Sequence, residues 1–416
     1  MNTTMKNGKS PLAIVLGGTS PHIELIRQIK SRGYHTVLID YLPDAPAIKY
    51  ADDFIRESTL DKERVLQIAK DIQAKLVISA CIDQANCTCC YVAERLGLPQ
   101  PYSYETSLDV TDKGRMKTRM VAGGVPTSQF QVFHSVDEIN WSKVMFPAVV
   151  KPVDCNSSKG VRRVDTVCEA ENWGRDALRL SRTGCAIIEG YNNGREIQVD
   201  CLAGLDGTTV LMTREKKHIV SMNSVELNST GSVIPAQCCT GREDELADIA
   251  GRITGAFGLH NTPFFYQAIV LDTGEINVLE FAPRVGGGLS YYLIKELIGF
   301  DPVKAVIQSF LGEKIMAEAK PVSLLYSTNA LYMEEGTFDH VTGLEDLKAK
   351  GCIKEFFVTK SKGTKISGNM RSGNRVASFV VDGRSMEELW EKEKLAYGIV
   401  DVIDDLGRSK LKRLAN

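Results

Sequence analysis

The sequence predicts an α/β fold that begins with a parallel, doubly wound sheet. Three short apolar runs have the composition of buried strands: "PLAIVLGG" (11–18), "HTVLID" (35–40) and "KLVISA" (75–80). Segments with helical periodicity separate or follow them, "SPHIELIRQIKSRGY" (20–34) and "DQANCTCCYVAERLGLP", the latter closed by Gly97 and a proline. Because strands and helices alternate, the strands are expected to lie parallel in one sheet with helices on its faces.

Length and composition limit the class of protein. With 416 residues, the chain is expected to form two to four domains. An apolar content of 43% and a charged content of 25% are typical of globular proteins. A net charge of −2 gives no reason to expect a nucleic-acid partner, and no apolar run is long enough to predict a membrane span. The 11 scattered cysteines, without a signal peptide before them, predict reduced thiols in a cytoplasmic protein.

The first strand and helix allow a dinucleotide-binding hypothesis. Gly17 and Gly18 follow the strand, and Asp40 ends the next strand. However, the turn "GGTSPH" lacks the third glycine of the full fingerprint, so the match is weak. We therefore favour a layer that only supports its neighbours, and keep a dinucleotide-linked oxidoreductase as an alternative.

The cysteine-rich segment "CIDQANCTCC" (81–90) has a metal and a packing interpretation. Cys87 and Cys90 have metal-ligand spacing, but no two further ligands follow at similar spacing. On a helix these positions form one face, and free cysteine packs as a small hydrophobic residue. The sequence therefore favours burial.

A basic helix follows, from Lys113 to Arg119, and ends at Gly123 and Gly124. Taken alone, such a run is more typical of a solvated cationic face than of a binding site. The next segment, "FPAVVKPVDCNSSKG" (146–160), changes that interpretation.

This segment has the features of a phosphate-binding site. An apolar strand ends with Lys151, and a short polar loop with Ser157, Ser158 and Gly160 follows. The ammonium group supplies charge, while hydroxyl and backbone N–H groups supply hydrogen-bond donors. The loop is not a P-loop, because it lacks the Gly-Lys-Ser/Thr ending and a following helix start.

Acidic residues lie on or at the end of the following strands. One strand ends at Glu189, and "REIQVDCLA" carries Glu196. A strand that contacts an adenine edge, followed by an acid for a ribose hydroxyl, has this pattern, and so does an ordinary hairpin. Further on, "FFYQAIVL" and "INVLEFA" flank the turn "DTGE". If these two strands are antiparallel, Gln267 and Glu280 lie side by side and offer oxygen ligands suited to Mg²⁺.

In this order the segments resemble the ATP-grasp superfamily, closest to its carbamoyl-phosphate-synthetase-like carboxylate–amine ligases. The resemblance runs from about residue 11 to the end of the chain. It implies an α/β fold with a Rossmann-like N-terminal domain, an ATP-grasp unit of two α+β subdomains and a small C-terminal α+β segment. The implied domains are 1–112, the lid 113–190, the body 191–320 and the C-terminal domain 321–416.

The resemblance also implies a nucleotide site. Lys113 and Lys151 correspond to the two lysines that hold the nucleotide phosphates. The loop 154–160, with Ser157, Ser158 and Gly160, corresponds to the flap over the γ-phosphate. Glu189 corresponds to the adenine hinge and Glu196 to the ribose ligand.

The same resemblance implies a metal site and a catalytic arginine. Gln267 and Glu280 correspond to metal ligands, and Arg284 corresponds to the arginine that steadies the transferred phosphoryl group or the substrate carboxylate. One position departs from the family pattern. The family usually has Asn two residues after the second metal-binding Glu, and here that residue is Ala282.

The implied activity is ATP-dependent ligation of a carboxylate and an amine. An acylphosphate forms, the amine attacks it, and ADP and phosphate are released, with Lys151 and Arg284 neutralising charge. The implied cofactors are ATP and Mg²⁺, with Mn²⁺ as a substitute, and the partners are small-molecule substrates, with a homodimer as an ordinary assembly. Ala282 keeps open a degenerate ATP-binding sensor or scaffold.

The C-terminal part, 351–400, alternates strands and turns and then has an amphipathic helix. The resemblance suggests a small domain packed against the active site, from which Arg371 and Arg375 reach the substrate. Solvated turn residues are the favoured alternative for these two arginines.

Overall fold

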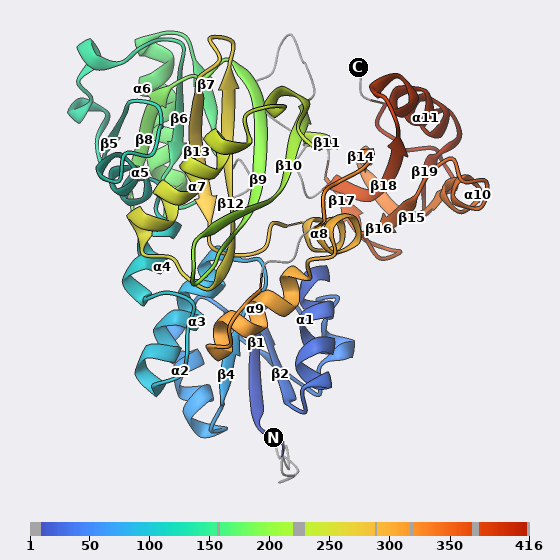
Figure 1. The fold of residues 1–416 in the computed structure, drawn as a ribbon, viewed down its shortest axis with the longest axis horizontal. Coiled ribbons are helices and arrows are strands. Elements are labelled where there is room, and N and C mark those ends of the chain that lie inside the picture. Colours follow the sequence, from blue (N-terminus) through green and yellow to red (C-terminus); the bar gives the residue numbers. More distant parts are fainter. Residues whose placement is uncertain are drawn as a thin grey trace.

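The computed structural model describes residues 10–155, 159–218, 229–287, 289–316, 320–367 and 374–413. The N-terminal layer lies at the bottom of Figure 1, the lid at the upper left and the C-terminal segment at the right, with the body between them. No helix in these ranges is both long and apolar enough to cross a bilayer.

The N-terminal layer is a parallel sheet, as the alternation of strands and helices predicts. Its strand order is β3-β2-β1-β4, and all its pairings are parallel. Its strands are β1 (Leu12–Leu16), β2 (His35–Asp40), β3 (Asp53–Arg56) and β4 (Leu76–Ile78). The helices are α1 (Ser20–Ser31), α2 (Lys62–Asp71) and α3 (Asp83–Leu96). Helix α3 ends at Gly97, whose φ of 64° is the left-handed conformation that glycine adopts most easily.

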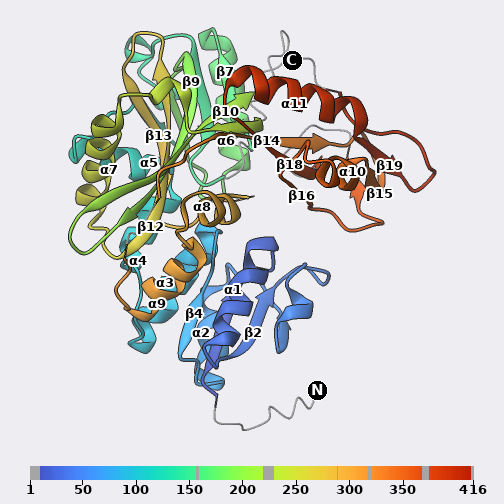
Figure 2. The same cartoon turned by 45° about the vertical axis from the view of Figure 1, so that its right-hand side comes forward.

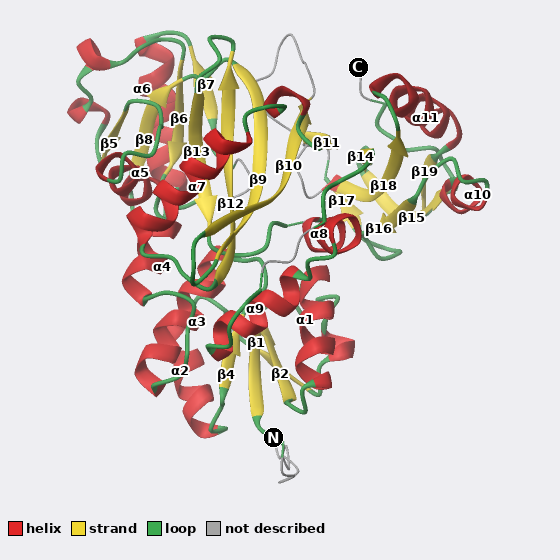
Figure 3. Ribbon diagram, viewed as in Figure 1, coloured by secondary structure: helices red, strands yellow, loops and turns green. Residues whose placement is uncertain are grey.

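A helix from much later in the chain completes the core of this layer. After α8 (Ser290–Ile298), helix α9 (Pro302–Leu311) packs against β4 and α1 (Figures 1 and 3). Its buried side chains, including Val306 and Phe310, belong to the same hydrophobic cluster as the strand residues. The predicted domain limits stay predictions. An N-terminal domain that ends at residue 112 does not include α9, although α9 shares its hydrophobic core.

The lid is a four-stranded antiparallel sheet in the order β5-β8-β6-β7. Its strands are β5 (Phe130–Phe133), β6 (Ala148–Pro152), β7 (Arg162–Val164) and β8 (Ala186–Gly190), and α6 (Val167–Leu180) packs on it. Two helices lead into it, α4 (Tyr104–Thr111) and α5 (Lys113–Ala122). Helix α5 begins where the sequence places the basic helix, and the Asp112 side chain accepts a hydrogen bond from the backbone N–H of Arg115 as its cap.

The body is one eight-stranded sheet in the order β13-β12-β9-β10-β11-β14-β18-β16. The first five strands are β9 (Gly194–Ala203), β10 (Thr208–His218), β11 (Ser229–Ile234), β12 (Thr262–Leu271) and β13 (Ile276–Ala282), with α7 (Glu243–Phe257) packed against them. The last three are β14 (Leu325–Tyr332), β16 (Glu355–Val358) and β18 (Arg375–Gly383). The sheet is therefore continuous across residue 320, since β14 pairs with β11.

The C-terminal segment adds a smaller sheet, β17-β15-β19. Its elements are β15 (Gly336–Thr342), α10 (Leu344–Ala349), β17 (Lys365–Ile366), α11 (Met386–Ile399) and β19 (Asp401–Asp404). Helix α11 is the amphipathic helix predicted near the end of the chain, and it packs on β18 and β14 (Figure 2). Short 3₁₀ turns lie at Ile48–Tyr50, Val136–Glu138, Trp141–Lys143 and Gln237–Cys239.

Candidate active site

A cavity of about 320 Å³ lies where the lid meets the body. The lid contributes strands β6 and β8, and the body contributes β9, β10, β12 and β13. The cavity lining includes seven of the residues that the sequence singles out: Lys113, Lys151, Glu189, Glu196, Gln267, Glu280 and Arg375. The fold therefore brings together residues that are up to 262 positions apart in the sequence, from Lys113 to Arg375.

The hairpin β12–β13 places Gln267 directly opposite Glu280. The two strands are antiparallel and these two residues are register partners, which confirms the expectation that they share one face. With the Gln267 amide nitrogen turned toward the acid, it lies 3.2 Å from Glu280 Oε1, and the amide oxygen lies 3.0 Å from Lys216 Nζ. Rotating the amide by half a turn brings the Gln267 oxygen toward the Glu280 carboxylate instead. A cation bound between these two oxygens would stabilise that orientation. The donor set therefore fits a hard divalent ion.

Glu189 is buried between two lysines. It lies on β8, and its carboxylate forms ion pairs with Lys151 of β6 and with Lys117 of α5, whose Nζ lies 2.7 Å from Glu189 Oε2. Burial acts to raise the pKa of the Glu189 carboxyl, but Lys151 and Lys117 outweigh it and lower that pKa to about 2. One carboxylate thus holds both cations at the wall of the cavity.

Lys117, like Lys216 and His218, is a residue of this site that the sequence did not single out. Its side chain is fully buried, and its Nζ also donates a hydrogen bond to Thr127 Oγ1 at 2.6 Å. Lys113 lies four positions earlier on α5, and its Nζ donates to the backbone oxygen of Cys155 at 2.8 Å. Neither lysine therefore belongs to a solvated face, which agrees with the change of interpretation that the segment 146–160 prompts. The four-residue spacing was the available signal, because it places them on one helix face.

Glu196 is the second buried acid of the cavity. It lies on β9 and forms ion pairs with Lys216 and His218 of the neighbouring strand β10, the His218 Nε2 atom lying 2.9 Å from Glu196 Oε2. Burial acts to raise the pKa of Glu196, but Lys216, together with the hydrogen bond from His218, lowers it to about 2. Because Lys216 also approaches Gln267, it links the candidate ribose and metal positions.

Arg284 lies outside the cavity lining. Its guanidinium forms a two-pronged ion pair with Asp83 of α3, with distances of 2.5 Å from Nε to Oδ1 and 2.6 Å from the second terminal nitrogen to Oδ2. It also lies over the Phe265 ring, 5.2 Å from the centroid. Burial acts to lower the pKa of Arg284, but Asp83 raises it above its usual range. In this structure the arginine joins the body to the N-terminal layer, and Glu280 is close enough to contribute to its raised pKa.

Arg375 lies at the cavity wall, at the start of β18. One of its terminal nitrogens donates to the Ser229 backbone oxygen at 3.2 Å and to the Tyr332 hydroxyl at 3.1 Å. Its Nε is buried and has no hydrogen-bond partner among the described residues. The favoured expectation of a solvated turn residue is therefore wrong for Arg375, whereas Arg371 lies outside the described residues.

The flap residues are described only in part. Ser157 and Ser158 lie outside the described residues. Gly160 has a φ of 76° and packs so closely on the lid that an added Cβ would lie 2.9 Å from Leu180 and from Pro152. Gly160 does not line the cavity. The only support for its place in the proposed flap is its left-handed backbone conformation, which favours glycine. Ala282, at the position where the family usually has Asn, is buried at the end of β13.

The dinucleotide-binding features are used within the protein. The Asp40 carboxylate is buried and accepts hydrogen bonds from the backbone N–H groups of Gly18, at 2.7 Å, and Leu42, at 2.9 Å. An added Cβ at Gly18 would lie 2.6 Å from the Ala45 Cβ, so the turn is closely packed. The arrangement favours the supporting layer over the dinucleotide site. Of the two cysteines with metal-ligand spacing, Cys90 is buried, as the packing interpretation predicts, and Cys87 is half-buried.

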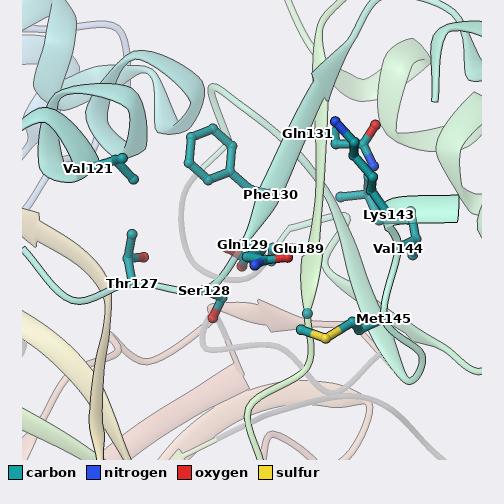
Figure 4. Close-up of a pocket in the computed structure, with 12 residues that line it drawn as sticks. Val121, Thr127, Ser128, Gln129, Phe130, Gln131, Lys143, Val144, Met145 and Glu189 are labelled. Atoms are coloured by element: carbon teal, nitrogen blue, oxygen red, sulfur yellow. The ribbon is translucent and has the colours of Figure 1, made fainter. Parts of the chain in front are cut away.

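A second cavity of about 420 Å³ borders the outer strands of the lid (Figure 4). Its walls come from β5, from the end of β8 and from residues 143–145, and Phe130 and Met145 contribute apolar surface. The Glu189 carboxylate, its one acid among the described residues, is already held by two lysines. The described residues contain no cluster of three or more His, Cys, Asp or Glu side chains suited to a metal.

Residues 144–291 match the family model of the ATP-grasp domain. The chain therefore contains an ATP-grasp domain at these residues, and its overall fold is shared with solved structures along nearly its whole length. The fold is similar to that of an L-amino acid ligase from Bacillus licheniformis, with a TM-score of 0.79, 20% identity and coverage of 96% of this chain and 100% of that one.

Two further solved structures have a similar fold. Phosphoribosylglycinamide synthetase from Anaerococcus prevotii matches with a TM-score of 0.74 and 17% identity, over 95% of this chain and 100% of that one. The biotin carboxylase domain dimer of 2-oxoglutarate carboxylase from Hydrogenobacter thermophilus, in complex with MgADP, ADP and bicarbonate, matches with a TM-score of 0.74 and 17% identity. That match covers 96% of this chain and 91% of the domain. These likenesses confirm the predicted ATP-grasp fold over nearly the whole chain.

Proposed function

We propose that this protein is an ATP-dependent carboxylate–amine ligase whose nucleotide binds in the cavity between lid and body. One observation carries the proposal. The facing pair Gln267–Glu280, which offers oxygen ligands, shares a single cavity with the two lysines Lys113 and Lys151. Oxygen ligands beside two ammonium groups suit a magnesium-bound polyphosphate. The MgADP complex of the similar biotin carboxylase domain supports this choice of ligand.

Three of the lysines in the cavity lining are already paired with acids. Lys151 contacts Glu189, Lys113 Nζ lies 3.7 Å from Glu280 Oε2, and Lys216 contacts Glu196. We propose that a nucleotide draws Lys113 and Lys151 toward its phosphates and leaves Lys117 to hold Glu189. The lysines then exchange one anionic partner for another, so no buried charge is left unpaired during binding.

Gln267 and Glu280 are the residues that would hold Mg²⁺, or Mn²⁺ in its place. When bound, the ion supplies positive charge that neutralises the phosphate oxygens. Ala282 offers no side-chain oxygen, and Mg²⁺ readily keeps water ligands, so a site with these two side chains remains suitable.

The proposed chemistry needs no nucleophile from the protein. The substrate carboxylate oxygen attacks the γ-phosphorus of ATP, and the bond from that phosphorus to the ADP oxygen breaks. The amine nitrogen then attacks the acyl carbon of the acylphosphate, an amide bond forms, and phosphate leaves with the bonding electrons while the nitrogen loses a proton. Lys151 orients the phosphoryl group and neutralises its charge, and the flap 154–160 excludes water.

Arg284 stays the proposed second catalytic residue, although it lies outside the cavity lining. A guanidinium has five N–H donors, and Asp83 uses only part of that set. We propose that Asp83 holds Arg284 in place, and that a donor not used by Asp83 steadies the substrate carboxylate or the transferred phosphoryl group when the cavity is filled.

Arg375 is proposed to recognise the acid substrate. Its buried Nε is without a partner among the described residues, and it enters the cavity from the C-terminal segment. Arg375→Ala should therefore raise the KM of the acid while the KM of ATP stays the same. An unchanged KM for the acid would remove Arg375 from the site.

Ligand-induced stabilisation gives a first test of the binding proposal. ATP with Mg²⁺ should raise the Tm of the full chain, and Mg²⁺ with NAD should leave it unchanged, because binding to the folded state stabilises it by mass action. Stabilisation by NAD but not by MgATP would favour the oxidoreductase alternative. Stabilisation by MgATP with no turnover, whatever acid and amine are added, would favour the degenerate sensor that Ala282 suggests.

A further inference from the structure

We propose that a separate cavity, beside the C-terminal helix, binds a small anion that carries a planar ring. This cavity has a volume of about 930 Å³ and lies between α11, residues 411–413 and the ends of β10 and β14. Small-molecule sites have volumes of roughly 300–1,000 Å³, so its size suits a compact ligand. The proposal does not depend on the function proposed above.

The cavity lies on the other side of β10 from the candidate active site. Successive side chains of a strand point to opposite faces of a sheet. In agreement with this, Lys216 lines the candidate active site and Lys217 lines the cavity beside α11. Among the described residues, His218 alone borders both. The cavity beside α11 is therefore a distinct site and not an extension of the candidate active site.

One cation in the lining, Lys217, is already neutralised by an acid. The Lys217 ammonium donates to Glu393 Oε1 at 2.8 Å, to Ser327 Oγ at 2.9 Å and to Asn329 Oδ1 at 2.7 Å. These contacts use all three of its donors. Glu393 is the one acid among the described lining residues, and its carboxylate is already ion-paired with Lys217. It therefore does not neutralise the other cations of the lining.

Three further cations of the lining have no acidic partner. Lys394, Lys412 and Arg413 form no ion pair with any residue that the structure describes, and Arg413 donates only to the Tyr397 backbone oxygen, at 3.3 Å. They come from two segments, α11 and residues 411–413, and line one cavity. A basic run on a single helix is usually a solvated face, but cations from two segments around one cavity concentrate positive potential there.

An exposed tryptophan adds a flat apolar surface. The Trp390 side chain is 58% exposed and lies on α11, four residues before Lys394, so the ring and the cation share one helix face. Tyr397 lies about one turn further along and also lines the cavity. An aromatic ring stacks well on a planar ligand. The combination of a stacking surface with unpaired cations indicates a ligand with a ring and a negative charge.

The test uses Trp390 fluorescence in the full chain. Two of the three tryptophans, Trp141 and Trp173, lie in the lid and are replaced by Phe, so that Trp390 is the sole reporter. This protein is titrated with phenyl phosphate, with inorganic phosphate and with phenol. Phenyl phosphate should quench Trp390 saturably, and its Kd should be lower than those of the other two probes by roughly tenfold or more. The reason is that inorganic phosphate lacks the ring and phenol lacks the negative charge.

Substitutions locate the bound probe. Lys394→Ala and Lys412→Ala should each weaken phenyl phosphate binding roughly tenfold, whereas Lys304→Ala, at an exposed position of α9, should not. Both cavity lysines lie at the surface of the fold, so an unchanged Tm should accompany the loss of binding. Lys151→Ala, which removes a cation of the candidate nucleotide cavity, should bind the probe as wild type does.

Four outcomes would overturn the proposal. They are quenching that does not saturate, equal binding of phenol or of inorganic phosphate, equal binding by the two cavity variants and wild type, and weaker binding by Lys151→Ala. The last outcome would place the probe in the nucleotide cavity and would leave the proposed ligase function untouched.

Discussion

Lys117 Nζ lies 2.7 Å from Glu189 Oε2, and neither side chain is exposed to more than a small degree, at 0% and 3%. Lys151 contacts the other oxygen of the same carboxylate. A lysine of α5 and a lysine of β6 thus converge on one acid of β8, and this buried triad forms one wall of the candidate nucleotide cavity.

The triad predicts a pH dependence of stability. The pKa of Glu189 falls from its usual 4.5 to about 2 in the folded state. Its ionised form therefore stabilises the fold fully above pH 4.5, and this contribution is lost as the pH falls from 4.5 toward 2. Urea unfolding at a series of pH values should show a shallower loss of stability in Glu189→Gln than in wild type over that window. The same substitution at the exposed Glu391 should leave the wild-type slope. Equal slopes in all three proteins would contradict the ion-paired triad.

Lys151→Ala should weaken ATP binding or abolish turnover. A lost charge-assisted contact to phosphate corresponds to roughly 1.5–3 kcal/mol. Binding of a fluorescent ATP analogue and phosphate release measure the two effects, and Lys75→Ala, at an exposed position before β4, is the matched control. If Lys151→Ala binds and turns over ATP as wild type does, the assignment of this cavity to ATP is wrong.

At the metal site, Glu280→Gln should lose far more activity than Gln267→Glu. The first change removes the acid of the facing pair, whereas the second adds a charge and keeps an oxygen ligand. Turnover is measured at increasing Mg²⁺ and Mn²⁺, and the required metal concentration should rise for Glu280→Gln. Small and equal effects of the two substitutions would show that the hairpin does not hold the ion.

The pair Arg284–Asp83 separates a structural from a catalytic role. Both side chains are 14% exposed, so Asp83→Asn leaves a largely buried cation with a weaker partner and should lower the free energy of unfolding by about 3 kcal/mol. Asp165→Asn removes a 60% exposed partner of Arg163 and should cost less than about 1 kcal/mol. Denaturant unfolding measures both, and equal small losses would mean that Asp83 does not hold the arginine.

Arg284→Lys tests the catalytic role of the same residue. Lysine keeps the charge but lacks the planar fork that holds two oxygens at once. Turnover should fall strongly, while ATP affinity stays nearly unchanged. Unchanged turnover in this variant would limit Arg284 to joining the body and the N-terminal layer.

Local patterns were enough to predict many of the elements and one key contact. Period-two alternation in β12 and β13, with a short turn between them, predicts that Gln267 and Glu280 face each other, and their register confirms it. The strands and helices of the N-terminal layer follow from the same kind of pattern. Such features depend on neighbours in the sequence, so a single sequence contains the information.

Features that depend on distant packing could not be predicted in this way. The basic helix gives no local sign that Lys117 is buried, because its partner Glu189 lies on another element. Arg284 and Asp83 are 201 residues apart, so no spacing indicates their ion pair. Helix α9 is apolar on a face that suits any core, and only the assembled fold shows that it closes the N-terminal layer.

The most direct test of the proposed ligase activity is a phosphate-release assay with the full chain, ATP, Mg²⁺ and panels of carboxylic acids and amines. We predict that ADP and phosphate appear in equal amounts, that their release needs both an acid and an amine, and that an amide of the two accumulates at the same rate. Lys151→Ala and Glu280→Gln should lose this activity. Pyrophosphate as the product, or phosphate release that is indifferent to every carboxylate, would contradict the account.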